Sequence, residues 1–306
     1  MPKPITSASS RTSALPAGLA DKPIVSAVSE VEAAIPRDRW DRPLIIPPGG
    51  GKPVAYVRSS TVAEVLEDKF NLNQWQKRMV AGGMAKRADL VLSAAQIEHD
   101  DELSVQAKKK ELDLITEAAM EANGAGMAAR DGTTLHAFTD RLDRGLSLPK
   151  GLPPHVNKML RAYGKATEKM DFIDSEQFVV HDEWGVAGTY DRRVFFEGAL
   201  RIGDLKTGQH IDYLGLKTCA QVVSYAEGDL YDLDGERTPH GADTDLGILI
   251  WLPYTTNPDD VVCEVRWLDL VWGRRAVKEA MRIRKLRAVR PLVLMPRIEG
   301  HPPEKG

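Results

Sequence analysis

The chain has 306 residues, of which 42% are hydrophobic and 28% charged, and its formal net charge is −3. This composition is ordinary for a soluble globular protein, and the length allows one large or two small domains with an ample core. The slightly negative charge excludes a protein that coats nucleic acid over its whole surface, so any DNA contact is expected to be local.

The first 52 residues are rich in Pro, Ser, Ala and Gly and show no sustained periodicity. This pattern predicts a flexible arm with at most short ordered pieces. A glycine run ends this segment, but it lacks the spacing of a phosphate-binding loop, and Pro53 has no amide hydrogen to offer. The segment therefore indicates no nucleotide-binding site and no built-in helicase motor. The remaining chain is predicted to be one domain at 53–300, with a helical part at 53–170 and a catalytic sheet core at 171–290.

Apolar residues at helical spacing predict helices from residue 61 to about residue 123, and a further helix from about Asp131 to Gly145. In the latter, the residues that form the apolar stripe are Leu135, Phe138 and Leu142. His136 and Asp140 lie four residues apart on a different face. A single histidine on a helix is usually structural or exposed, but His136 could also bind a metal through its neutral imidazole, with Asp140 orienting the ring. Residues 153–170 predict another helix.

A strand is expected at 177–184, followed by two runs of β-branched and aromatic residues separated by Glu197 and Gly198, which predicts a β-hairpin. Strand alternation on the second run places Leu200, Ile202, Asp204 and Lys206 on one face. Asp191, on the first run, can reach the same end of the sheet. A helix follows, in which Gln221 and Tyr225 share a face.

These residue types suit metal-dependent hydrolysis of a phosphodiester, which needs a hard cation that activates water and neutralises phosphate charge. Mg²⁺ or Mn²⁺ would find oxygen ligands in Asp191, Asp204 and the backbone carbonyl of Leu205. Lys206 could hold the nucleophilic water and stabilise developing charge. Gln221 and Tyr225 could orient the phosphate. The alternative at each position is an exposed polar strand face or a half-buried helix face without catalytic role.

The C-terminal third predicts strands at 246–253 and 261–268 and a last helix at about 270–289. Before them, residues 227–245 contain seven acids and one arginine, which indicates a solvated insertion. On the last helix Trp272, Ala276, Ala280 and Ile283 share one face, and the basic residues on another face are Arg274, Lys278, Arg282 and Lys285. This basic face is either a solvated surface or a stripe that binds DNA phosphates without sequence preference.

The order of these motifs resembles the RecB-family nucleases of the PD-(D/E)XK superfamily. The matching stretches are GTTLHAFTDRL, GTYD, DLKTG and QVVSY, which cover roughly residues 130–230. A weaker likeness to phage-type members covers residues 56–79. The resemblance implies that His136, Asp191 and Asp204 are metal ligands and that Lys206 is the catalytic lysine. It also implies that Gln221 and Tyr225 contact DNA or position the reacting phosphate.

The resemblance implies an α/β restriction-endonuclease-like core, a mixed central sheet flanked by helices with extra helices before it. The implied activity is that of a DNA nuclease, more specifically an exonuclease, that uses Mg²⁺ or Mn²⁺ in replication, recombination or repair. The implied substrate is DNA ends or single strands. A recombination or replication protein is implied as a further partner. The alternatives are a non-catalytic DNA-binding or assembly module with the same fold, and a nuclease that acts on RNA or on flaps.

The number of cysteines and the hydropathy of the chain indicate the compartment in which the protein works. Cluster-bearing RecB-like nucleases carry four cysteines, whereas this chain has only Cys219 and Cys263, so no iron–sulfur cluster is expected. Two distant cysteines fit a reducing compartment. No apolar run approaches the ~20 residues of a membrane span, and the N-terminus lacks the pattern of a signal peptide. The expected location is the cytoplasm of a bacterium or a phage-infected cell, without membrane contact.

Overall fold

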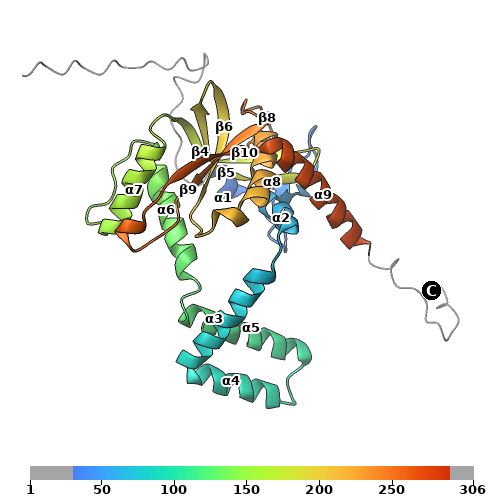
Figure 1. The fold of residues 1–306 in the computed structure, drawn as a ribbon. Helices are drawn as coiled ribbons and strands as arrows, with labels where there is room; N and C mark the ends of the chain where they lie inside the picture. Colours follow the sequence, from blue (N-terminus) through green and yellow to red (C-terminus); the bar gives the residue numbers. More distant parts are fainter. Residues whose placement is uncertain (1–29, 290–306) are drawn as a thin grey trace, which may run out of the picture.

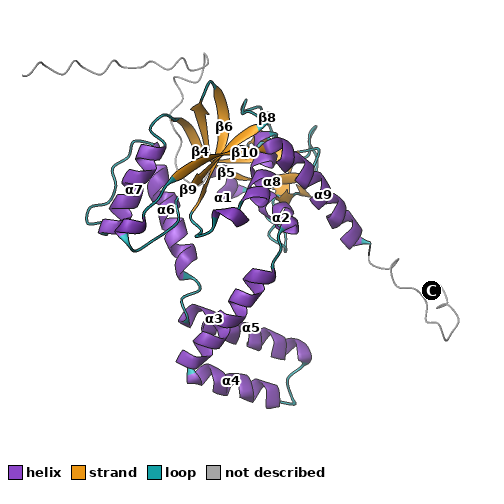
Figure 2. Cartoon of the chain, viewed as in Figure 1, coloured by secondary structure: helices purple, strands orange, loops and turns teal. Residues whose placement is uncertain are grey.

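The computed structural model describes residues 30–289. They form an α/β fold, in which helices flank a mixed central sheet (Figure 1, Figure 2). The helices in chain order are α1 (Glu30–Ala34), α2 (Ser59–Ala63), α3 (Phe70–Lys86), α4 (Ala88–His99), α5 (Val105–Ala122), α6 (Met127–Asp143), α7 (Pro154–Ala166), α8 (Gly215–Ala226) and α9 (Leu270–Ala288). The single-turn 3-10 helices are η1 (Glu64–Leu66), η2 (Ile211–Tyr213) and η3 (Pro258–Asp260). Within this part of the chain, no helix has both the length and the apolar character needed to cross a membrane.

The strands in chain order are β1 (Leu44–Ile45), β2 (Val54–Ala55), β3 (Val57–Arg58), β4 (Asp171–His181), β5 (Val186–Phe196), β6 (Ala199–Lys206), β7 (Asp229–Tyr231), β8 (Arg237–Thr238), β9 (Leu246–Trp251) and β10 (Glu264–Asp269). The central sheet has the order β10-β9-β6-β5-β4-β7-β8, and β3 pairs with β5 beside this path. β6 is parallel to β9 and β3 is parallel to β5, whereas the other neighbours are antiparallel. The predicted hairpin is confirmed, since β5 and β6 turn at Glu197 and Gly198.

Apolar clusters fix the helices on both faces of this sheet. On one face, α2, α8 and α9 pack over a cluster that includes Val179 and Ile202. On the other face, α6 and α7 pack over a cluster that includes Val194 and Leu205. The predicted apolar stripe of α6 is confirmed, because Leu135 is buried in the second cluster and two further apolar residues of the helix pack against it. The middle strands β5 and β6 are therefore held rigidly from both sides.

The helices α3, α4 and α5 form a three-helix unit that projects away from the sheet (Figure 1). Its small core consists of Leu90, Ile115 and Ala119. Gly83 allows α3 to pass close to α5, because a Cβ atom at this position would overlap the carbonyl oxygen of Ala119. The unit is an addition to the α/β layers, as the helical pattern of residues 61–123 predicts.

The N-terminal segment departs from the expectation of an arm that extends to residue 52. Ile35 and Ile45 are buried against β4, β5 and β7, and Val57 pairs with Val186 at the start of β5. The segment is part of the core because a few well-spaced apolar residues can be buried without regular periodicity. Residues 1–29 of the predicted arm and residues 290–300 of the predicted domain lie outside the described residues.

The acidic stretch 227–245 also differs from the predicted solvated insertion. It supplies two short strands, β7 and β8, to the edge of the sheet. His240 is buried and its Nε2 lies 2.9 Å from the carbonyl oxygen of Tyr225. The stretch is therefore built onto the end of α8, although most of its acids remain at the surface.

Candidate active site

The candidate site lies where β5 and β6 part. Their ladder ends at the pair Arg192 and Gly203, while β6 continues to follow β9 as far as Lys206. Beyond the last pair, the backbone amide of Leu205 donates a hydrogen bond to Oδ2 of Asp191 at 2.8 Å. A side-chain carboxylate thus replaces a strand partner at this point. The fork brings Asp191 next to the segment that carries Asp204 and Lys206.

The side-chain alternation of β5 slips by one residue at Asp191. Tyr190 and Arg193 both bond to Asp174, so they share one face although they are three residues apart. Arg192, between them in sequence, points to the opposite face and to α6. Glu176 on β4 lies opposite Asp191 in the ladder. Its φ is 51°, a left-handed value that a residue other than glycine rarely adopts. Strained backbone of this kind is concentrated at functional sites, and here it turns two acids out of the regular pleat.

Asp204 and Lys206 form an ion pair inside the fork. Nζ of Lys206 lies 2.7 Å from Oδ2 and 3.0 Å from Oδ1 of Asp204, whose side chain is almost completely buried. Burial raises the pKa of Asp204 to about 6, although Lys206 opposes this. Burial acts to lower the pKa of Lys206, but Asp204 and Asp191 outweigh it and hold that pKa above its usual value. The predicted common face of these two residues is confirmed.

His136 approaches the same fork from α6. Its Nδ1 lies 3.6 Å from Oδ2 of Asp191, and its ring also bonds to the backbone carbonyl of Leu205. Burial lowers the pKa of His136, while Asp191 acts to raise it. The ring is therefore neutral near pH 7, which is the form that can bind a metal. The structure thus brings His136 next to Asp191 and Leu205, and their role as metal ligands stays a prediction.

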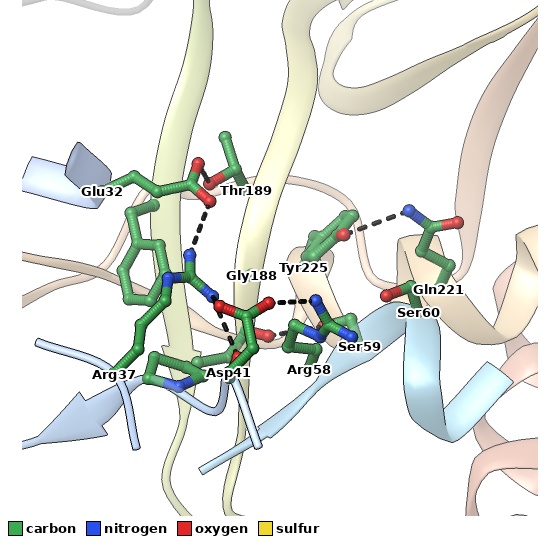
Figure 3. A pocket seen from close by; sticks show the side chains of 13 residues that line it. Glu32, Arg37, Asp41, Arg58, Ser59, Ser60, Gly188, Thr189, Gln221 and Tyr225 are labelled. Carbon is green, nitrogen blue, oxygen red and sulfur yellow. Dashed lines mark hydrogen bonds and ion pairs between the residues drawn. The ribbon is translucent and has the colours of Figure 1, made fainter. Parts of the chain in front are cut away.

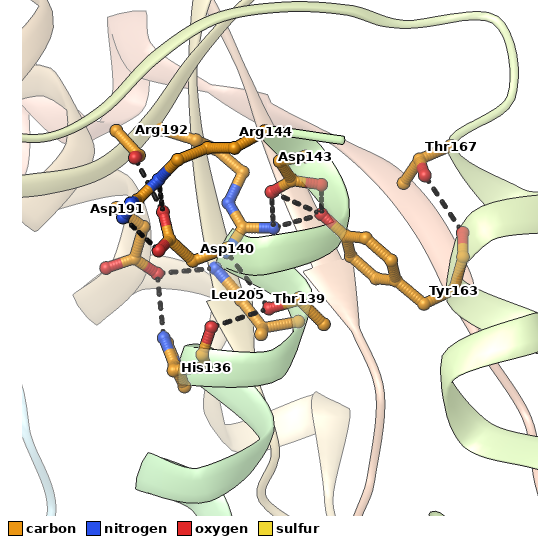
Figure 4. A network of polar contacts seen from close by, with 11 residues as sticks. His136, Thr139, Asp140, Asp143, Arg144, Tyr163, Thr167, Asp191, Arg192 and Leu205 are labelled. Carbon is orange, nitrogen blue, oxygen red and sulfur yellow. Dashed lines mark hydrogen bonds and ion pairs between the residues drawn. The ribbon is translucent and has the colours of Figure 1, made fainter. Parts of the chain in front are cut away.

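The polar face of α6 is fixed to the sheet by a buried network (Figure 4). Asp143, two turns after His136, lies 3.1 Å from the buried guanidinium of Arg192 and accepts a hydrogen bond of 2.7 Å from Tyr163 on α7. The Tyr163 hydroxyl also accepts a hydrogen bond from Arg192. This network ties the helix that carries His136 to the strand that carries Asp191. The network therefore helps to set the spacing between His136 and Asp191.

Asp140 does not orient His136, contrary to the expectation. It accepts a hydrogen bond of 2.6 Å from Ser175 on β4 and pairs with Arg144 one turn later on α6. The reason is that the two residues, four apart on one helix, face different strands of a twisted sheet. Asp140 consequently anchors the helix, and Asp191 and Leu205 contact the imidazole instead.

Gln221 and Tyr225 lie on α8, where both line a pocket (Figure 3). They line a pocket of about 390 Å³ together with Arg58 and Gly188. Nε2 of Gln221 donates a hydrogen bond of 3.1 Å to the Tyr225 hydroxyl, and burial raises the pKa of this tyrosine. Tyr225 is only 5% exposed, so it supports Gln221 rather than presenting its ring to a ligand. Gln221 remains half-buried and available to the pocket.

The donor atoms of the fork suit a hard divalent cation, although no metal site is fully assembled. Two carboxylates, a backbone carbonyl and one neutral imidazole are the ligand types that Mg²⁺ and Mn²⁺ accept. Oδ2 of Asp204 is buried, and the ammonium of Lys206 lies 2.7 Å from it. Over residues 30–289, no three His, Cys, Asp or Glu side chains lie close enough to hold an ion as they stand. Metal binding would therefore require these side chains to move closer together.

Glu176 is a further acid at the fork that sequence reasoning missed. Burial and the neighbouring Asp191 raise the pKa of Glu176 to about 7. Its position between Ser175 and Gln177 suggested an ordinary strand residue, and only the break in alternation reveals that it faces Asp191. The one signal in the sequence was an acid at the start of an apolar strand, which is too common to be informative.

Glu176 is expected to make stability depend on pH. Because its pKa rises from an ordinary 4.5 to about 7 on folding, the folded protein binds a proton that the unfolded chain releases between these values. Its contribution of about 1–3 kcal/mol is then complete below pH 4.5 and lost as pH rises through 7. Thermal melts in EDTA should show that the melting temperature falls less between pH 5 and pH 8 in Glu176→Gln than in the wild type. An identical loss in both proteins would show that Glu176 does not titrate in this range.

The basic face of α9 is only partly free for DNA. Nε of Arg274 pairs with Glu227, and its other end lies 3.5 Å from Asp245, so this residue joins α9 to the acidic stretch. Arg282 is exposed and pairs with Glu279, while Lys278 and Lys285 are exposed. Sequence spacing could not show that the acids of residues 227–245 fold back on α9.

The predicted apolar face of α9 is also shifted. The residues that α9 buries are Leu270, Gly273, Ala276, Val277 and Ala280. Trp272 is instead 58% exposed, and Ile283 is 37% exposed. The cause is close packing on α8, since a Cβ atom on Gly273 would overlap the backbone of Cys219. The face of α9 that contains Gly273 therefore packs on α8, in place of the face that contains Trp272.

Comparisons with known proteins do not place the chain in a family. No family model matches the sequence, and no curated protein matches it.

Proposed function

We propose that this protein is a divalent-metal-dependent DNA nuclease with a PD-(D/E)XK core of the RecB type. The observation that supports this most is the fork between β5 and β6, where Asp191 bonds to the amide of Leu205 and Asp204 pairs with Lys206. A mixed sheet flanked by helices is compatible with such a core. His136 completes a donor set suited to Mg²⁺ or Mn²⁺.

The contacts in the fork support a distinct proposed role for each residue. His136, Asp191, Asp204 and the Leu205 carbonyl would hold the cation, which lowers the pKa of a bound water and offsets phosphate charge. Lys206 stays protonated beside Asp204 and Asp191, so it can hold the attacking water in place and stabilise negative charge as it develops. Gln221, supported by Tyr225, can donate a hydrogen bond to the substrate phosphate.

Metal-dependent release of nucleotides from DNA tests this proposal. End-labelled linear DNA should be degraded with Mg²⁺ or Mn²⁺ and remain intact with EDTA, and a closed circle should resist if the enzyme is an exonuclease. Parallel reactions with single-stranded, duplex, flapped and RNA substrates would define the substrate. Binding that falls with salt but yields no product with either metal would contradict the proposal and support a non-catalytic DNA-binding module.

A further inference from the structure

A groove of about 900 Å³ is lined by one face of α3 together with η1, η2 and the first turn of α8. Four of the apolar side chains in its lining are exposed, namely Phe70, Leu72, Trp75 and Leu216. Exposed apolar side chains gathered in one groove are a common mark of a docking surface. The charges of the lining and the rest of the chain indicate what docks there.

The charged residues of the groove favour a basic partner. Glu67 and Lys217 in the lining pair with each other at 2.8 Å. Apart from this pair, the lining contains two exposed aspartates and a single arginine, namely Asp68, Asp212 and Arg78. This excess of negative charge is unfavourable for phosphate and favourable for lysine and arginine side chains.

The end of α9 has a surface of the complementary kind. Three exposed apolar residues follow one another there at intervals of three, so that each neighbours the next on the helix surface. These residues, called the α9 patch below, are Ile283, Leu286 and Val289. The stretch 282–288 also contains four lysines and arginines and no acid. Apolar side chains among positive charges thus match a groove that has apolar side chains among negative charges.

The α9 patch does not occupy the groove of its own molecule. The preceding turns of α9 pack on α8, and the helix also contacts α2 and η1 (Figure 1). None of the three patch residues lines the groove, and Leu286 is 73% exposed. Because its earlier turns fix the helix in this position, the patch is presented to other molecules.

We propose that the α9 patch of one molecule binds in the groove beside α3 of a second copy of this chain. The inference goes beyond the proposed nuclease function and does not depend on it. The patch would pack on the apolar side chains of the groove, and Lys285 and Arg287 would lie near Asp68 and Asp212. An amphipathic helix in an apolar groove is a common mode of recognition between proteins. Since the two surfaces differ, repetition of the contact gives a closed ring or an open filament.

Analytical ultracentrifugation of the full chain, in EDTA and without DNA, tests this contact. The wild type should form species larger than a monomer as its concentration rises. Leu286→Asp, which alters the patch, and Leu72→Asp, which alters the groove, should each weaken association at least about 10-fold. Leu92→Asp is the matched control, because this leucine is also exposed on a helix but lies on α4 outside the groove, and it should assemble as the wild type does. Thermal melts of each variant check that the fold is kept.

Mixing the two variants distinguishes this contact from a symmetric one. Leu286→Asp keeps an intact groove and Leu72→Asp keeps an intact patch, so an equimolar mixture should form a heterodimer and no larger species. A wild type that stays monomeric at every concentration, or assembly that persists in either variant, would overturn the proposal. Two folded, monomeric variants that do not pair when mixed would overturn it as well. Metal-dependent DNA cleavage by a monomeric wild type would leave the nuclease proposal intact and remove only this contact.

Discussion

Asp204→Ala and Lys206→Ala are each expected to lower the rate of DNA cleavage at least ~10²–10³-fold while DNA binding is largely retained. Loss of one preorganised charge that stabilises a transition state has about this effect. The Asp204→Ala substitution would remove a metal ligand. The Lys206→Ala substitution would remove the ammonium that lies 2.7 Å from Asp204.

Single-turnover cleavage of end-labelled DNA, with thermal melts of each variant, checks this prediction. Lys206→Met is a useful third variant, because it keeps most of the side-chain length without the charge. Lys158→Ala serves as the matched control, since this lysine also forms an ion pair but does so on the surface, with Asp259. Cleavage at the wild-type rate by folded Asp204→Ala would show that the assigned site is wrong.

Arg192→Ala is expected to destabilise the protein by about 3–5 kcal/mol, which lowers the melting temperature by roughly 10 °C. The guanidinium is almost completely buried, and its removal leaves Asp143 and the Tyr163 hydroxyl buried without their charged partner. The contacts between α6, α7 and β5 would be lost together. The spacing of His136 and Asp191 would then be less well defined.

A variant that replaces the whole network by apolar residues separates stability from positioning. Arg192→Met, Asp143→Leu and Tyr163→Phe together should recover most of the melting temperature, because a buried pair contributes little net stability over apolar packing. Arg266→Met is the control, since its pair with Glu264 is exposed and worth no more than about 1 kcal/mol. A melting temperature unchanged in Arg192→Ala would refute the importance of this network.

The local features of the fork were predictable, because short-range rules determine them. Alternation along β6 placed Asp204 and Lys206 on one face, and the Glu197-Gly198 turn set the hairpin that brings Asp191 near them. Helical spacing likewise paired Gln221 with Tyr225. These rules concern neighbours in sequence, where backbone geometry fixes the direction of each side chain.

The features that were missed depend on long-range packing. Glu176 enters the site only because alternation slips in two strands at once, which period-two reasoning cannot anticipate. Arg274 is withdrawn from the basic stripe by Glu227, a contact 47 residues away in sequence. Asp140 bonds to Ser175 on β4, which lies 35 residues away in sequence. Each of these depends on where a distant element packs.

The short strand β3 has a consequence for self-association. β6 pairs with only the second half of β5, so Val57 and Arg58 cover part of the edge that the parting strands would expose. Uncovered strand edges recruit other extended chains and promote aggregation. The two-residue strand therefore shields this edge of β5, and under the proposed function it leaves the gap between β5 and β6 open for the ion and the scissile phosphate.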